Sequence, residues 1–339
     1  MSADWTRLPD LAARSLGGSV VYANDEFFAA RDNLVTDAAP SFEAQTFGPK
    51  GQVYDGWETR RRREPGEDHA IVRLGAPGIV RGVVVDTSFF TGNYPPYASV
   101  EACAVAGYPA PEELSGWITV VPRSPLHGDS RNAFVVTDPH RFTHVRLTIY
   151  PDGGVARLRV HGDVVPDPEL LPAVLDLAAM EHGGLVVACS NMFYGPPHRL
   201  IAPGLARVMG EGWETARRRD DANDWAVVRL AAPGRVHLAE LDTSHFKGNA
   251  PGAASLRGIV SDVDDLDGLD GADGWFDMLP CTRLQPDTRH RFRIDADRPA
   301  THVRLDIFPD GGMARLRLYG EPTPTARAAL THRWHTTTP

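Results

Sequence analysis

The chain has 339 residues and a formal net charge of -9, which argues against nucleic acid as a partner because a phosphate backbone attracts a basic protein face. Apolar residues make up 42% and charged residues 23%, the balance of a globular protein rather than a disordered one. No apolar run approaches the ~18 residues that span a bilayer, and the N-terminus lacks a basic segment followed by an apolar one. We therefore expect a cytoplasmic protein with no membrane partner.

Cysteine and lysine are both scarce. The three cysteines, Cys103, Cys189 and Cys281, form no CxxC motif and predict no disulfide framework. Lys50 and Lys247 are the only lysines, so nearly every cation is arginine. An ammonium group is a compact donor that can lose its proton when buried, whereas guanidinium cannot, so a retained lysine suggests a specific need for lysine.

The sequence contains an internal repeat. Residues Gly56 to Pro95 and Gly212 to Pro251 align without gaps and share 23 of 40 residues. A second block, Thr143 to Leu147, recurs as Thr301 to Leu305, and both copies run on into Pro-Asp-Gly-Gly and Ala-Arg-Leu-Arg. The chain is therefore a duplicated domain, and each half is long enough to bury a core of its own.

Each repeat is expected to begin with a weakly amphipathic helix, Leu8 to Leu16 or Leu171 to Ala179, followed by a Gly-Gly pair. A short apolar strand and an aromatic pair follow, Phe27-Phe28 in the first copy and Phe193-Tyr194 in the second. The first repeat then carries about ten extra residues in the loop Thr36 to Asp55.

The middle of each repeat predicts two strands separated by Ala-Pro-Gly, which we expect to form a turn. In the first copy these strands are Ala70 to Leu74 and Val80 to Asp86, and in the second they are Ala226 to Leu230 and Val236 to Asp242.

Late in the first repeat, apolar residues alternate with polar ones on both sides of the Pro-Asp-Gly-Gly turn. Val145, Leu147 and Ile149 share one face, and His144 and Arg146 share the other. This pattern is typical of an antiparallel hairpin with one face in the core and one cationic face.

Short strands interrupted by proline and glycine, with little helix, predict an all-β protein of two tandem jelly-roll β-sandwiches. We place the first repeat at residues 1–165 and the second at 166–325. Residues 326–339 are expected to form a loosely held C-terminal tail.

Four longer motifs stand out: Asp55-Gly-Trp-Glu-Thr-Arg-Arg, Asp86-Thr-Ser-Phe-Phe-Thr-Gly-Asn-Tyr-Pro-Pro, Asp242-Thr-Ser-His-Phe-Lys-Gly-Asn, and Thr301-His-Val-Arg-Leu through Pro309-Asp-Gly-Gly. With these motifs the sequence resembles the allantoicase family, also called allantoate amidinohydrolase. The likeness covers essentially residues 10 to 320. It implies a fold of two galactose-binding-like jelly rolls and the hydrolysis of allantoate to ureidoglycolate and urea in purine degradation.

Allantoate carries two ureido groups and a carboxylate on one carbon, so release of urea breaks a C–N bond at an aminal centre. The reaction needs an acid for the departing nitrogen, a base for water and a cation for the carboxylate, and it requires no metal or other cofactor. A metal-dependent amidinohydrolase remains an alternative, although the chain has no HExxH, no His-x-His and no Asp-rich His motif.

The repeats differ most informatively after Asp242. His245 and Lys247 stand where the first copy has Phe89 and Thr91. Histidine can carry a proton near neutral pH, and Lys247 can hold the carboxylate or protonate the leaving urea. Candidate catalytic residues are therefore His245, Lys247, Asp242 and Glu214. The alternative is a solvated loop in which the aspartate and the asparagine of each copy only shape the turn.

The arginine runs allow two interpretations. Glu58 can pair with a neighbouring arginine in a structural network, or one guanidinium of each run can bind the substrate carboxylate with two hydrogen bonds. The candidate substrate-binding residues, taken from both repeats, are Arg61, Arg217, Asn93, Asn249 and Trp213. His144 and His302 occur in both copies and are expected to belong to the framework.

Two further expectations concern the whole protein. A non-catalytic tandem module that binds a small ligand is the alternative to an enzyme, because jelly rolls often only hold ligands. The edge strands of a sandwich favour a homo-oligomer.

Overall fold

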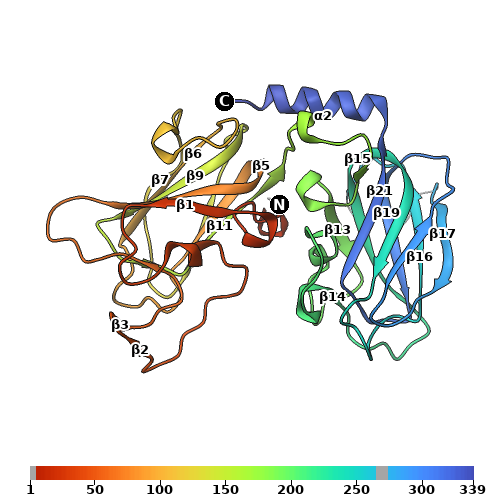
Figure 1. The fold of residues 1–339 in the computed structure, drawn as a ribbon, viewed down its shortest axis with the longest axis horizontal. Helices are drawn as coiled ribbons and strands as arrows, with labels where there is room; N and C mark the ends of the chain where they lie inside the picture. The colour runs from red at the N-terminus through yellow and green to blue at the C-terminus, as the bar shows by residue number, and fades with distance from the viewer. Residues whose placement is uncertain (1–4, 265–273) are drawn as a thin grey trace. The chain divides into compact units, whose positions relative to one another are not determined.

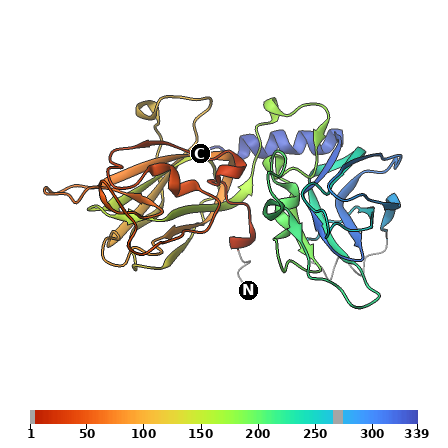
Figure 2. The ribbon, with the colours of Figure 1, turned by 60° about the horizontal axis from the view of Figure 1, so that its bottom comes forward.

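The computed structural model describes residues 5–264 and 274–339. The chain divides into two compact units, Met1–Val165 together with Trp334–Pro339, and Pro166–Arg333. The regular secondary structure of each unit is mostly β-strand, with short 3-10 helices and long loops between the strands (Figures 1 and 2). The prediction of an all-β protein with two tandem sandwiches is confirmed.

In the first repeat, two sheets share one long strand, β5 (Asp68–Asp86). The first half of β5 lies between β1 and β9, and the second half lies between β8 and β11. The remaining strands continue the first sheet beyond β9 in the order β6, β7. The bounds are β1 (Ser19–Ala23), β6 (Tyr97–Cys103), β7 (Ile118–Pro125), β8 (Arg131–Val135), β9 (Arg141–Tyr150) and β11 (Arg157–Val164).

The second repeat has the same arrangement around its own 19-residue strand, β15 (Asp224–Asp242). Its first half pairs with β13 and β19, and its second half pairs with β18 and β21. The bounds are β12 (Leu175–Asp176), β13 (Leu185–Cys189), β16 (Ala253–Ile259), β17 (Phe276–Arg283), β18 (Arg289–Arg293), β19 (Ala300–Phe308) and β21 (Arg315–Pro322).

Very short strands complete each repeat near one end of the sandwich. In the first repeat β4 (Trp57–Glu58) pairs with β10 (Gly154–Val155), and in the second β14 (Trp213–Glu214) pairs with β20 (Gly312–Met313). The extra loop of the first repeat contains a small hairpin of β2 (Phe47–Gly48) and β3 (Gly51–Gln52).

The expected Ala-Pro-Gly turn is wrong. β5 runs on through Ala76-Pro77-Gly78, and its pairing with β9 shifts register between Arg73 and Gly78. Proline lacks the N–H that a sheet ladder uses, so the strand leaves one sheet here and joins the other. The motif marks a bend between two sheets rather than the end of a strand.

The expected hairpin is also wrong. β9 and β11 flank the Pro-Asp-Gly-Gly turn, but each pairs with a different half of β5 and not with the other. Val145, Leu147 and Ile149 are fully buried as predicted, yet His144 is buried as well. A small apolar cluster that includes Ile71 covers that side of the sheet, so the second face is not a solvated cationic surface.

The predicted N-terminal helices are reduced to single 3-10 turns. The 3-10 helices are η1 (Trp5–Arg7), η2 (Arg14–Leu16), η3 (Arg31–Val35), η4 (Pro111–Glu113), η5 (Pro168–Leu170), η6 (Met180–His182), η7 (Pro197–Ile201) and η8 (Met209–Glu211). Gly17 and Gly183 end η2 and η6 in the left-handed region, so the glycine pairs do stop these segments as expected.

The C-terminal segment is not a loose tail. It forms α2 (Pro324–Thr336), the one α-helix in the part of the chain that the structure describes, visible in blue in Figure 1. The Arg141 guanidinium lies 3.4 Å from the centre of the Trp334 ring in the last turn of this helix, and the backbone N–H of Arg141 donates to the carbonyl of Thr337, just after the helix, at 2.7 Å. Among the described residues no helix is long and apolar enough to cross a membrane.

Candidate functional site

The candidate residues gather at one end of each sandwich. We call residues 24–29, 57–64, 86–95 and 150–154 the first end cluster, and residues 190–195, 213–220, 242–251 and 308–312 the second. Hydrogen bonds between these loops hold each cluster together. In the first, for example, the Trp57 indole N–H donates to the Asp25 carbonyl at 2.7 Å, and Gly154 N–H donates to the Asn93 carbonyl at 2.7 Å.

The Pro-Asp-Gly-Gly turn explains part of this organisation. Asp152 accepts a hydrogen bond from the backbone N–H of Arg62 at 2.8 Å, and Asp310 does the same for Arg218 at 2.8 Å. Gly153 has a φ of 143°, and a Cβ at Gly154 would lie 2.0 Å from the buried Phe90 ring. The two glycines are therefore needed for close backbone approach.

One arginine of each run has a structural partner deep in the sandwich. Arg62 contacts Asp68 at 2.6 Å and Arg218 contacts Asp224 at 2.9 Å, and the two aspartate side chains are 2% and 0% exposed. Pairing with a cation offsets the cost of burying these carboxylates. Arg62 and Arg218 therefore secure the loops to the long strands.

The neighbouring arginines, Arg61 and Arg217, are exposed, and the structure gives them no hydrogen-bond or ion-pair partner among its described residues. Arg61 borders an open hollow of about 370 Å³ together with Asn24, Asp25, Arg60, Arg62, Arg63, Glu64 and Asp68. A guanidinium without a protein partner can bind a carboxylate through two parallel hydrogen bonds. The prediction that Arg61 and Arg217 bind substrate stays open and is compatible with this geometry.

The expected pairing of Glu58 with an arginine is wrong. Its Oε1 accepts a hydrogen bond from the Asn93 side chain at 2.7 Å, and Glu214 accepts one from Asn249 at 2.5 Å. The arginines pair with aspartates instead, as Arg60 does with Asp25 at 2.6 Å. The sequence candidates Glu214, Asn93 and Asn249 thus lie together in two equivalent Glu–Asn pairs.

Two carboxyl groups of the first end cluster differ in acidity. Burial raises the pKa of Glu58, and the hydrogen bond from Asn93 offsets this only in part. Burial also acts to raise the pKa of Asp25, but hydrogen bonds from the Phe27 and Arg60 N–H groups, together with the Arg60 charge, lower it on balance. Environments that separate two pKa values in this way are typical of acid–base sites.

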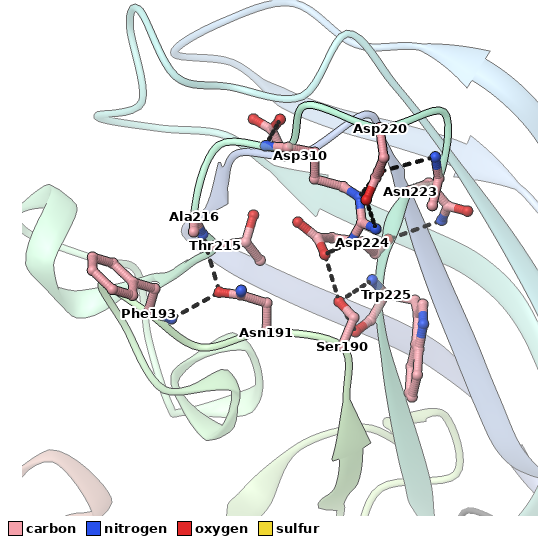
Figure 3. Close-up of polar contacts among 12 residues, drawn as sticks. Ser190, Asn191, Phe193, Thr215, Ala216, Asp220, Asn223, Asp224, Trp225 and Asp310 are labelled. Carbon is pink, nitrogen blue, oxygen red and sulfur yellow. Dashed lines mark hydrogen bonds and ion pairs between the residues drawn. The ribbon is translucent and has the colours of Figure 1, made fainter.

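Figure 3 shows the second end cluster, where Asn191 replaces Asp25. The Asn191 side-chain oxygen accepts from Phe193 N–H at 2.9 Å and from Ala216 N–H at 3.0 Å. Nearby, the Ser190 hydroxyl donates to Asp224 at 2.8 Å. The backbone scaffold is thus the same as in the first cluster, but the Asp25–Arg60 ion pair has no counterpart because residue 216 is alanine.

The residues expected to be catalytic in the second repeat take different positions. His245 is half-buried, and its Nε2 lies 2.9 Å from the Ala206 carbonyl, which ties down the preceding loop. Lys247 is exposed on the same loop. Asp242 is 1% exposed, and its Oδ1 accepts from Ser244 N–H at 2.8 Å. Its side chain therefore shapes the turn from inside, and contact with a substrate is not supported.

Trp213 is also not a surface residue. Its side chain is fully buried, and its indole N–H donates to the Asn191 carbonyl at 2.8 Å. Full burial leaves no exposed face of this ring for a substrate, so the structure does not support the prediction that Trp213 binds substrate. His144 and His302 are buried at 2% and 1% exposure, which agrees with a framework role.

Sequence reasoning did not identify Asp25 or Asn24, and it gave Glu58 only a structural role beside an arginine. The Asn24 side chain donates to Asp68 at 3.0 Å. A usable signal was present, because Asp25 and Arg60 change together to Asn191 and Ala216 between the repeats. Within the described residues, no group of three or more His, Cys, Asp and Glu side chains is arranged to hold a metal ion.

Two tandem β-sandwiches, each with a polar loop cluster at one end, define a duplicated jelly-roll protein. The sequence belongs to a defined family within this class. The model of the allantoicase repeat matches residues 9–165 and again residues 175–323, so the chain belongs to the allantoicase family.

Relatives of known sequence and structure agree with this assignment. A probable allantoicase of Nocardia farcinica is 56% identical over 94% of this chain and 95% of its own length. A probable allantoicase of Pseudomonas paraeruginosa is 43% identical over 92% of this chain and 96% of its own length. The crystal structure of allantoicase from Saccharomyces cerevisiae is 34% identical, with a TM-score of 0.80 and 92% coverage of both chains.

Proposed function

We propose that this protein is an allantoicase, a hydrolase that converts allantoate and water to ureidoglycolate and urea in purine degradation. The observation that carries the proposal is family membership over both repeats, with 56% identity to a probable allantoicase along almost the whole of both chains.

The end clusters supply the groups that this reaction needs. A proton must reach the nitrogen of the departing urea while the remaining ureido nitrogen stabilises the electron-poor carbon, and water then adds. Each cluster has a carboxyl group oriented by an asparagine, Glu58 or Glu214, and an exposed arginine whose N–H groups are available to the substrate, Arg61 or Arg217. The second cluster adds Lys247.

A direct assay tests the reaction. The purified protein is mixed with allantoate, and urea and ureidoglycolate are followed with time. We expect both products in equal amounts. Lys247→Ala then reports on the second cluster, because loss of urea release with the fold intact assigns a role in turnover to Lys247. If Lys247→Ala releases urea at the rate of the wild type, catalysis is assigned to the arginines and the first repeat.

The alternative from another class is a tandem module that binds a small ligand without reaction. Its expected result is heat of binding on titration with allantoate and no urea. A metal-dependent amidinohydrolase would lose urea release on treatment with a chelator and recover it with one divalent ion. The acid–base route proposed above predicts the same rate before and after chelation.

We also propose that the protein self-associates. Large apolar side chains are exposed within the end clusters, including Phe27 at 43%, Phe193 at 71% and Tyr194 at 65%. Such exposed groups are typical of association surfaces. Sedimentation analysis of the wild type and of the double variant Phe193→Ser, Tyr194→Ser tests this, and a wild type that stays monomeric at high concentration contradicts it.

A further inference from the structure

The two end clusters are built on one scaffold but carry different charges. Asp25 and Asn191 accept the same two backbone hydrogen bonds, from residues 27 and 60 in the first repeat and from residues 193 and 216 in the second. Asparagine therefore satisfies the scaffold equally well. The negative charge of Asp25 has one further use, the contact of its Oδ2 with the Arg60 guanidinium at 2.6 Å.

The extra loop of the first repeat brings a second cation to the same place. The Lys50 ammonium donates to the Phe27 carbonyl at 2.6 Å and lies 4.8 Å from the centre of the Phe27 ring. The Arg60 guanidinium lies 5.4 Å from the same ring centre. Lys50 and Arg60 thus converge on one exposed aromatic ring, and both retain further N–H groups for an anion.

The first end cluster also contains a carboxyl group protected from these cations. Glu58 lies on β4, and its backbone is fixed by hydrogen bonds with Ala29 in both directions, each 3.2 Å. Its Oε1 is occupied by the Asn93 N–H, so a proton on this carboxyl group must sit on Oε2. The Arg60 and Arg62 guanidinium groups are turned to Asp25 and Asp68.

We propose that Glu58 is the proton donor of the reaction and that Lys50 and Arg60 form the subsite for the substrate carboxylate, so that turnover takes place in the first repeat. The O–H bond of the Glu58 carboxyl group breaks and an N–H bond forms on the departing ureido nitrogen as its C–N bond breaks. Water then adds to the carbon and returns a proton to Glu58. One water is consumed and the enzyme is unchanged.

The environment of Glu58 supports this assignment, because burial raises its pKa and keeps part of the carboxyl group protonated closer to neutral pH. In the second repeat Ala216 removes one cation, and the loop that carries Lys50 is about ten residues shorter. The inference rests on the proposed hydrolysis of allantoate and specifies which residues perform it.

Urea release from allantoate by the wild type, Glu58→Gln and Glu112→Gln tests the proton donor, with the exposed Glu112 as a control outside both clusters. We expect kcat to fall ~100-fold or more in Glu58→Gln with little change in KM, and no change in the control. The kcat of the wild type should decline on the alkaline side as Glu58 loses its proton, and the residual rate of the variant should lack this decline.

The subsite is tested by the double variant Asp25→Asn, Arg60→Ala, which installs the pair that the second repeat already tolerates. We expect KM for allantoate to rise at least tenfold with kcat within a few-fold of the wild type. This variant keeps the proposal testable even when Glu58→Gln does not fold. An unchanged KM contradicts the subsite.

Three results separate the possible errors. A wild type that releases no urea refutes the proposed function, and this inference with it. Release that persists in folded Glu58→Gln refutes only the proton donor. A loss in Glu214→Gln as large as that in Glu58→Gln, with both variants folded, contradicts the assignment of turnover to the first repeat.

Discussion

The adjacent residues Arg61 and Arg62 should differ strongly in how much stability the protein loses when each is replaced by methionine. In Arg62→Met the buried Asp68 loses its cation and keeps only the Asn24 side chain, because its second oxygen has no hydrogen-bond partner. In Arg61→Met no ion pair is broken. We therefore expect Arg62→Met to unfold far more easily and Arg61→Met to remain stable.

The magnitude follows from the burial of Asp68, whose side chain is 2% exposed. Removing one partner of a buried pair costs ~3–5 kcal/mol because an uncompensated charge stays behind. For a unit of this size each kcal/mol lowers Tm by about 2–4 °C, so Tm should fall by roughly 6–20 °C. Arg61→Met should stay within about 0.5 kcal/mol of the wild type.

Calorimetry and urea unfolding of four proteins provide the test: the wild type, Arg61→Met, Arg62→Met and the double variant Arg62→Met, Asp68→Asn. The double variant removes the charge as well as its partner, so it should recover part of the lost stability. The reasoning fails if Arg61→Met is destabilised as much as Arg62→Met, or if Asp68→Asn recovers nothing. In the activity assay, Arg61→Met should raise KM for allantoate.

Three more results are expected. Burial lowers the pKa of His144 from 6.5 to about 4, so protons bind the unfolded chain first and stability is lost as pH falls from 6.5 towards 4. The free energy of unfolding, measured with urea, should fall by about 2 kcal/mol between pH 7.5 and pH 5 because of His144. The variant His144→Gln should not show this contribution. Deleting residues 334–339 removes partners of Arg141 and should cost roughly 2–3 kcal/mol by thermal unfolding. His245→Phe removes the hydrogen bond to the Ala206 carbonyl and should lower the free energy of unfolding by about 1 kcal/mol, measured by urea unfolding. An unchanged free energy of unfolding would show that this hydrogen bond does not contribute to stability.

The repeat predicted most of the architecture because duplicated motifs fold in duplicate. The alternation around Val145 identified core residues correctly. It did not identify strand partners, because adjacency in sequence favours a hairpin, whereas β9 and β11 each find a longer run of backbone partners on β5. Pro77 predicts a turn between two strands, whereas in the structure it marks the bend at which one strand passes from one sheet to the other.

The candidate site could be predicted only in part, because its contacts join residues that are far apart in the sequence. Side chains such as Asn93 and Glu58 are 35 positions apart, and only the fold of the intervening strands brings them within hydrogen-bond distance. Charge alone favoured a Glu–Arg pair, since Arg60 is two positions from Glu58. The competing carboxylate, Asp25, comes from a loop whose position could not be deduced from local sequence.

Comparison of the two copies separates scaffold from chemistry, but only once the contacts are known. His245 and Phe89 differ in sequence and share a left-handed backbone, with φ of 72° and 69°. Each anchors its preceding loop, His245 through the Ala206 carbonyl and Phe89 by stacking on Phe42 at 5.8 Å. His245 and Phe89 therefore perform the same structural task, holding the preceding loop, through different contacts. The change of Asp25 to asparagine in the second copy keeps every scaffold bond and alters only charge, so it is the difference that points to chemistry.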